Sequence, residues 1–169
     1  SFPTRRSSDL LLNAVGSQAA VSIENSRLYQ SETEKLRLER DLDLARKIQE
    51  TLVPKNIPLF EDVEISGKML PAMQVGGDYF DIIKVSEKKI FVVVGDVSGK
   101  GLSASLYMTK LQTFINLYCH QYQNPLDIMY ELNRQIYKSF ERHWFITLTL
   151  ALFDLEKGIV EVCRAGHVP

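Results

Sequence analysis

The sequence has few features that would crosslink a fold or hold it in a membrane. Its 169 residues include only two cysteines, Cys119 and Cys163, which form no close pair, so neither a disulfide framework nor a CxxC zinc or redox site is indicated. No run of about 18 or more apolar residues could span a bilayer, and the first residues lack the apolar core of a secretory signal. These absences predict a soluble, cytoplasmic protein.

An excess of charge of one sign is also missing. The chain carries 20 basic and 21 acidic residues, for a formal net charge of −1. This balance argues against a nucleic-acid-binding surface spread over the whole protein and against a polybasic membrane anchor. The hydrophobic fraction of 45% is sufficient for a globular core, in one medium domain or in a long helix with part of a domain.

Residues 24–50 contain no glycine or proline and are crowded with charged side chains. Their apolar residues recur at the spacing of one helical seam, which predicts a linker helix over 31–53 that ends before Pro54. Polar residues interrupt this seam, so we expect a weak or adjustable parallel coiled coil. A solvated single helix lying on its own domain is the alternative. The seam comprises Leu28, Leu38, Leu42, Ala45 and Leu52, and the interruptions are Ser31, Lys35 and Gln49.

Upstream, residues 10–30 also have a helical pattern, but they are more apolar and richer in alanine. We interpret them as the last helix of a preceding domain that continues into the linker helix. Residues 1–9 match neither periodicity, and we expect a disordered end or a cloning scar there.

After Pro54 the pattern changes to short strands and two helices. Alternation predicts strands at 63–69, 79–85 and 89–94, the last two joined by a turn at 86–88. Helices are expected at 102–122 and, after the N-cap Asn124 and Pro125, up to residue 140. A second hairpin is expected from strands 145–153 and 159–164, with Gly158 in its turn. This order predicts an α+β fold with an antiparallel sheet.

Two Gly-Asp sites lie at the ends of the first predicted hairpin. Asp78 stands in GGDYFD (76–81), and Asp96 stands in GDVSGKG (95–101). If the strands pair through the turn at 86–88, both carboxylates lie at the same end of the hairpin, where they would suit Mg²⁺ or Mn²⁺. The alternative is that both Gly-Asp pairs are simple turns.

Two other interpretations of these motifs fit less well. The segment 95–101 is one residue short of a phosphate-binding P-loop, and Gly101 replaces its magnesium-binding hydroxyl. The segment GGDYF (76–80) matches the GGDEF signature of diguanylate cyclases at four of five positions. A strand follows directly here, however, and the second aspartate would be unexplained.

Five motifs in order carry a family resemblance: ERDLDLARKIQETLVPKNIP, LPAMQVGGDYFDII, FVVVGDVSGKGLSASLYM, FITLTLALFD and RAGHVP. From about residue 38 to 169 the chain resembles the SpoIIE-like (RsbU-like) branch of the metal-dependent protein Ser/Thr phosphatases (PPM, type 2C). The segment QAAVSIENSRLY resembles the final helix of a GAF sensor domain, which would occupy 10–30. Residues 54–169 would then be the N-terminal part of the phosphatase domain.

The resemblance implies an α-β-β-α sandwich of two antiparallel sheets, of which this chain would hold part. It also implies two Mn²⁺ or Mg²⁺ ions held by acidic residues. By position in the motifs, Asp78 and Asp96 are the expected catalytic metal ligands, with Asp96 bridging, and the backbone carbonyl of Val97 is a third ligand. In the family, these ions activate a water that attacks the phosphoryl group. The roles of Asp81 and His167 stay open.

The implied function is hydrolysis of phosphoserine or phosphothreonine on a regulatory protein, with a STAS-type anti-sigma-factor antagonist as the suspected partner. The family's later metal-binding motifs have no counterpart before Pro169. We therefore expect a C-terminally truncated, weakly active or inactive fragment, with a homodimer formed through the linker helix. The competing hypothesis is a non-catalytic dimeric signalling module, or pseudophosphatase.

Overall fold

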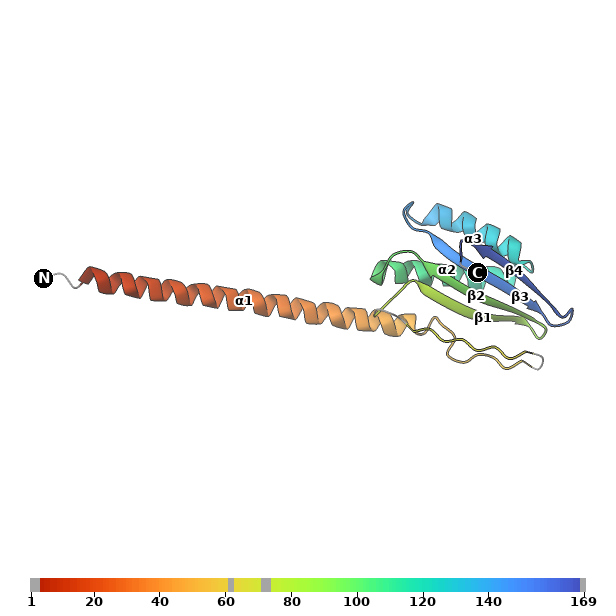
Figure 1. Ribbon diagram of the computed structural model, residues 1–169, viewed down its shortest axis with the longest axis horizontal. Helices are drawn as coiled ribbons and strands as arrows, with labels where there is room; N and C mark the ends of the chain where they lie inside the picture. Colours follow the sequence, from red (N-terminus) through yellow and green to blue (C-terminus); the bar gives the residue numbers. More distant parts are fainter. Residues whose placement is uncertain (1–3, 61–62, 71–73, 168–169) are drawn as a thin grey trace. The chain divides into compact units, whose positions relative to one another are not determined.

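The computed structural model describes residues 4–60, 63–70 and 74–167. The described residues form three helices and four strands, an α+β fold as predicted (Figure 1). The elements are α1 (Thr4–Gln49), β1 (Asp78–Ser86), β2 (Lys89–Val97), α2 (Gly101–Gln121), α3 (Pro125–Ser139), β3 (Ile146–Asp154) and β4 (Ile159–Ala165). The chain divides into two compact units, residues 1–41 and residues 42–169.

The first unit contains most of α1. Seam residues Leu28 and Leu38 are each 59% exposed, so their apolar surface is free to contact another helix. The helix begins at Thr4, whereas we expected none before Leu10. Residues 4–9 contain no glycine or proline, so the backbone hydrogen bonds of an established helix extend through them at little cost. No helix among the described residues is long and apolar enough to cross a membrane.

The second unit is built on one antiparallel sheet with the strand order β1-β2-β3-β4. Both predicted hairpins are confirmed. The first turns between Ser86 and Lys89, and the second uses Gly158 with a φ of +66°, a backbone conformation that favours glycine. The N-cap is confirmed as well, because the Leu126 N–H donates to the side chain of Asn124 at 2.8 Å.

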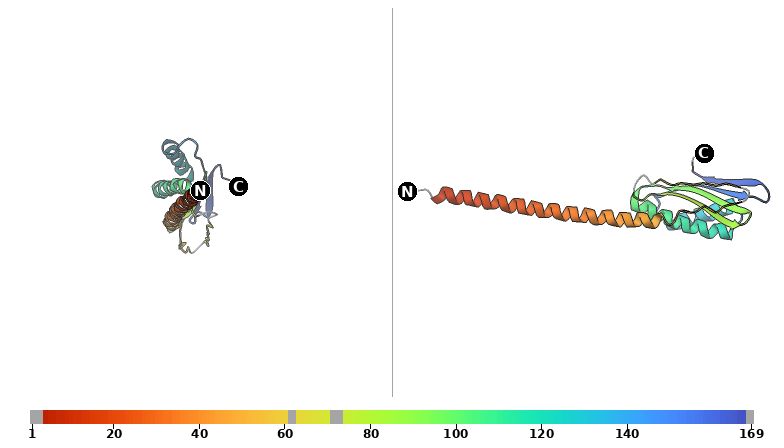
Figure 2. Two further views of the ribbon diagram at one scale, coloured as in Figure 1. Left: turned by 90° about the vertical axis from the view of Figure 1, so that its left-hand side faces the viewer. Right: turned by 90° about the horizontal axis from the view of Figure 1, so that it is seen from below.

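Helices α2 and α3 lie side by side on one face of the sheet (Figures 1 and 2). Side chains alternate along a strand, so every second residue of β2 and β3 points toward these helices. The buried core lies between the two layers, and each fully buried side chain contributes about 1.5–3 kcal/mol. It includes Phe91, Val93, Val97, Met108, Leu111, Ile115, Ile128, Leu132 and Leu150.

The opposite face of the sheet carries apolar side chains that remain accessible. Val94, Val160 and Val162 are 43%, 51% and 58% exposed, respectively. The register places Val162 opposite Ala151 and Ala151 opposite Val92, which makes a continuous apolar row across three strands. This row leaves apolar surface accessible on the face of the sheet that α2 and α3 do not cover.

The strand predicted at 63–69 is wrong. Residues 63–70 form neither a helix nor a strand in the structure, although Val63 and Ile65 are half-buried and Glu64 is exposed, as alternation requires. Gly67 lies close to the Phe80 ring of β1, where an added Cβ atom would overlap the ring. Alternation predicts the buried side of an extended segment, but not its hydrogen-bond partner.

Candidate functional site

The pairing of β1 with β2 brings the two predicted aspartates together. Asp78 is the first residue of β1, and it lies directly opposite Asp96 near the end of β2. Residues directly opposite in an antiparallel pair point to the same face, with Cβ atoms about 4.5–5.5 Å apart. Both residues are exposed. The two carboxylates therefore share one edge and one face of the sheet, as expected, while their role as metal ligands stays a prediction.

A glycine allows the close approach of the two strand ends. The Val97 N–H donates to the Gly77 carbonyl at 3.2 Å. A Cβ atom on Gly77 would overlap the Val97 carbonyl oxygen, so only glycine fits at this position. The Val97 carbonyl, the predicted third ligand, consequently lies against Gly77 and next in sequence to Asp96.

Burial and two neighbouring side chains shift the pKa of Asp96. Partial burial raises the pKa of Asp96, and the neighbouring Asp78 raises it further, while His167 acts in the opposite direction. His167 Nδ1 is 3.0 Å from Thr147 Oγ1, and Thr147 is the cross-strand partner of Asp96 on β3. His167, whose role stayed open from the motifs alone, thus borders the site on the β3 side.

Two cavities meet at the aspartates. The first, of about 310 Å³, is bounded by Gln49, Met69, Val75, Gly76, Gly77, Asp78, Asp96, Gly99, Lys100 and Gly101. The second, of about 240 Å³, is bounded by Lys68, Met69, Leu70, Asp78, Tyr79, Phe80, Val94, Gly95, Asp96 and His167. Because both include Asp78 and Asp96, the carboxylates are accessible from two sides.

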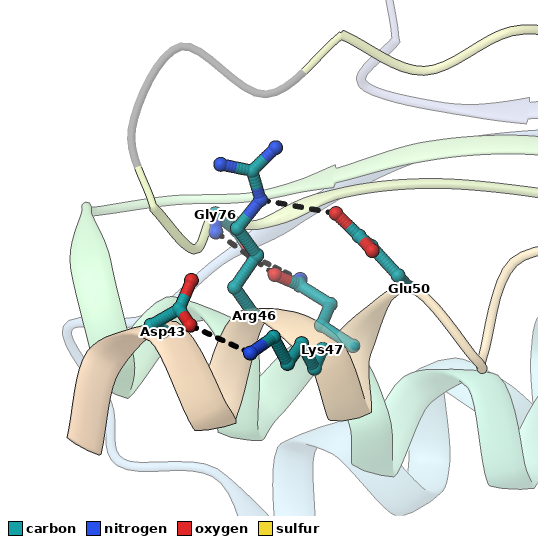
Figure 3. Close-up of polar contacts among 6 residues, drawn as sticks. Asp43, Arg46, Lys47, Glu50 and Gly76 are labelled. Carbon is teal, nitrogen blue, oxygen red and sulfur yellow. Dashed lines mark hydrogen bonds and ion pairs between the residues drawn. The ribbon is translucent and has the colours of Figure 1, made fainter. Parts of the chain in front are cut away.

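The end of α1 holds the loop that precedes Asp78. Gln49 is only 6% exposed, and its Nε2 donates to the Gly76 carbonyl at 2.6 Å. The Gly76 N–H in turn donates to Gln49 Oε1 at 3.2 Å (Figure 3). Exposed ion pairs, Asp43 with Lys47 and Arg46 with Glu50, lie on the same helical turns (Figure 3). In the sequence pattern, Gln49 is one of the residues that interrupt the apolar seam.

Asp81 lies away from the paired aspartates. Its carboxylate accepts hydrogen bonds from the Tyr79 hydroxyl and the Ile82 N–H, both at 2.8 Å. It is buried on the helix side of the sheet, and burial raises its pKa although both hydrogen bonds act in the opposite direction. Its observed contacts are structural.

The loop after Asp96 is fastened to the start of β3. The Ser98 N–H donates to the Phe145 carbonyl at 2.9 Å, and the Phe145 N–H donates to Ser98 Oγ at 3.0 Å. Gly99, with a φ of +92°, packs against the Trp144 ring. Ser98 therefore has a structural contact, while Lys100 borders the first cavity.

The donor atoms at the site suit a hard cation. Two carboxylates and a backbone carbonyl are oxygen ligands of the kind that Mg²⁺ and Mn²⁺ prefer. Across residues 4–60, 63–70 and 74–167, no group of three or more His, Cys, Asp or Glu side chains is arranged to hold a metal ion. The residues present thus fit part of the coordination sphere of such an ion.

Comparison with known proteins gives relatives in one family. The family model of Stage II sporulation protein E (SpoIIE) matches residues 86–169. Phosphoserine phosphatase RsbU of Bacillus subtilis is 28% identical over 132 residues, covering 78% of this chain and 39% of that protein. Phosphoserine phosphatase RsbP of the same bacterium is 27% identical over 140 residues, covering 80% of this chain and 34% of that protein.

A solved structure shares the fold. The crystal structure of the RsbU and RsbW domains of Rv1364c from Mycobacterium tuberculosis matches with a TM-score of 0.51 and 24% identity, covering 59% of this chain and 28% of that one. The antiparallel α+β fold of this chain is therefore shared with that structure. Residues 86–169 match the SpoIIE family model, and the two relatives support an RsbU-like phosphatase branch.

The contact between Gln49 and Gly76 predicts a measurable loss of stability. The variant Gln49→Leu keeps the side-chain bulk but leaves two backbone groups of Gly76 without these partners. We expect the free energy of unfolding to fall by about 1–3 kcal/mol, measured by urea denaturation. The control Gln121→Leu, at an exposed position of α2, should change it by less than about 0.5 kcal/mol. If both variants lowered the free energy of unfolding equally, the contact between Gln49 and Gly76 would not stabilise the fold as predicted.

Burial of Asp81 predicts a pH dependence. The pKa of Asp81 is raised in the folded state, so folding favours the protonated carboxyl. The stability that this preference contributes is fully present below the unfolded pKa and is lost as the pH rises through the folded pKa. The variant Asp81→Asn cannot ionise, so it should gain stability relative to wild type between about pH 4 and pH 7. Urea midpoints at several pH values measure this, with Asp127→Asn as the exposed control. A stability difference between Asp81→Asn and wild type that did not change with pH would show that folding does not raise the pKa of Asp81.

Proposed function

We propose that the full-length protein carrying this chain is a Mn²⁺- or Mg²⁺-dependent protein Ser/Thr phosphatase of a bacterial signalling pathway. The observation that carries the proposal is the placement of Asp78 directly opposite Asp96 at one end of the sheet. Two relatives, RsbU and RsbP, are phosphoserine phosphatases, which supports the same reaction type here. The chain spans 39% and 34% of the lengths of these relatives, so the activity is proposed for the whole protein.

Asp78 and Asp96 would hold the metal ions with their carboxylates, and Val97 would contribute its carbonyl oxygen. When bound, such ions supply a nucleophilic hydroxide at neutral pH and offset charge on the phosphoryl oxygens. The residues of the chain prepare this site in two ways. Gly77 permits the close approach of β1 and β2, and Gln49 fixes the preceding loop through its hydrogen bonds to Gly76.

Lys100 contributes to the binding of phosphate in this proposal. It borders the same cavity as the two aspartates and directly precedes the first residue of α2. Its ammonium group and the positive end of the helix dipole would attract a phosphoryl dianion toward the metal ligands. Substrate binding and metal binding would then share one cavity.

The substrate would be a phosphoprotein, for which a STAS-type anti-sigma-factor antagonist is the suspected candidate. We further propose a cytoplasmic homodimer in which the linker segment 31–53, helical in α1 up to Gln49, forms the coiled coil and residues 10–30 end a GAF-like sensor domain. The exposed apolar side chains of Leu28 and Leu38 support helix pairing, since burying them would remove apolar surface from water.

The activity test uses the full-length protein with Mn²⁺ and a phosphoserine protein or p-nitrophenyl phosphate. Asp96→Asn should lower kcat/KM by about 10²–10³-fold, the loss typical of removing one electrostatic stabiliser of the transition state. Asp127→Asn, an exposed carboxylate at the start of α3, should retain wild-type activity. Mn²⁺-dependent turnover that survives Asp96→Asn would refute the proposed role of the pair.

The 169-residue chain should bind metal weakly and show little or no turnover, because two carboxylates leave most coordination positions of two ions to water. Robust hydrolysis by this chain alone would contradict that expectation. If the full-length protein bound a phosphoprotein without hydrolysing it, the pseudophosphatase hypothesis would replace the catalytic one.

A further inference from the structure

The loop between β2 and α2 forms one wall of the first cavity at the paired aspartates. Gly99, Lys100 and Gly101 border this cavity together with Asp78 and Asp96. Gly99 and Gly101 have φ values of +92° and +70°, a region that favours glycine. Two flanking glycines restrict the backbone around Lys100 little, so the position of Lys100 depends on contacts that the rest of the fold supplies.

Backbone hydrogen bonds fix the start of this loop. The Val97 N–H donates to the Gly77 carbonyl at 3.2 Å, and Ser98 exchanges two hydrogen bonds with the backbone just before β3. The Val97 carbonyl, the proposed metal ligand, is therefore held at the end of β2. These hydrogen bonds end at Ser98, one residue before Gly99. The metal-ligand end of the loop is thus fixed separately from the part that carries Lys100.

The Trp144 ring supports this second part of the loop. An added Cβ atom on Gly99 would lie 2.6 Å from the ring, so the glycine backbone lies close to the indole. The ring packs against the core on the helix side of the sheet, with its centroid 4.8 Å from that of Tyr107 on α2. The Trp144 N–H donates to the Glu141 carbonyl at 3.0 Å, which fixes the turn before β3. Trp144 therefore joins the loop to α2 and to the start of β3.

We propose that Trp144 is a positioning residue for phosphate binding, whose ring holds Gly99 so that Lys100 is placed to bind the phosphoryl group. This inference rests on the proposed phosphatase function. Trp144 is not among the described residues that border the two cavities at the aspartates, so it acts through Lys100 and does not touch the substrate. The Lys100 side chain makes no capping hydrogen bond at the start of α2, so its ammonium group can pair with the phosphate.

Kinetics of the full-length protein with p-nitrophenyl phosphate and Mn²⁺ test the inference. Lys100→Ala should raise KM about tenfold, because it removes a charge-assisted hydrogen bond to the phosphate. Trp144→Leu should raise KM about fivefold, whereas the Mn²⁺ concentration that gives half-maximal activity should stay within about twofold of wild type. Trp144→Phe keeps an aromatic ring beside Gly99 and should recover most of the wild-type affinity.

A double-mutant cycle shows whether Trp144 acts through Lys100. If it does, adding Trp144→Leu to Lys100→Ala should raise KM by less than about twofold, because the group that the ring positions is already absent. An increase in KM of the same factor in both backgrounds would overturn the inference. An unchanged KM in Lys100→Ala would overturn it as well.

Gly99→Ala tests the same contact while the Trp144 ring stays in the core. The added methyl group would overlap the ring and displace the loop, so KM should rise at least as much as in Trp144→Leu. This variant allows the contact to be tested even if Trp144→Leu does not fold. An unchanged KM in Gly99→Ala would contradict the proposed role of the ring.

Phe140→Leu is the matched control. Phe140 is only 9% exposed, and its ring centroid lies 4.3 Å from that of Tyr107, so it belongs to the same aromatic cluster. The control should lower the melting temperature but keep the wild-type KM. If it raised KM as much as Trp144→Leu, a general loss of packing would explain both effects and the inference would be wrong.

The activity of the wild type separates this inference from the function on which it rests. Absence of Mn²⁺-dependent hydrolysis by the wild type would refute the phosphatase proposal, and the inference with it. Hydrolysis with a KM that neither Trp144→Leu nor Gly99→Ala changes would refute only the role of Trp144.

Discussion

The register between β1 and β2 determines where both aspartates lie. Side chains alternate across a strand, so a slip of one residue would move Asp96 to the helix side and turn Phe91 and Val93 outward. Phe91 and Val93 are fully buried beneath the helices, so hydrophobic burial holds the register that aligns Asp78 with Asp96. The geometry of the site is therefore a consequence of the core, completed by a glycine that lets the strand ends meet.

The site combines segments that are far apart in the sequence. Gln49 at the end of α1 holds the glycine loop before β1, while Thr147 on β3 contacts His167 beyond β4. Two consecutive glycines have little side-chain packing of their own, so the position of this loop depends on the amide of Gln49. The loop before Asp78 is thus held by Gln49, and both carboxylates stay accessible from two cavities.

Patterns that act locally could be predicted from the sequence. The alternation in β1 and β2, the turn between them and the Gly-Asp pairs were sufficient to place Asp78 near Asp96. The contacts of Gln49 and Ser98 could not be predicted, because a single side chain bonding a distant backbone leaves no periodic signal. Residues 63–70 show the opposite failure: their alternation marks the half-buried side chains correctly, yet no neighbouring strand pairs with them among the described residues. The role of Asp81 required the fold, since only its burial beside Tyr79 separates it from the paired aspartates.

The central claim is that Asp78 and Asp96 together bind a divalent cation. The most direct test is a titration of the isotope-labelled 169-residue chain with Mn²⁺, followed by paramagnetic broadening of its backbone amide signals. The account predicts that the signals of Gly77, Asp96 and Val97 broaden at the lowest Mn²⁺ concentrations, and that Asp78→Asn removes this selectivity. Broadening that began instead at the acidic residues of α1, or that was unchanged in Asp78→Asn, would contradict the account.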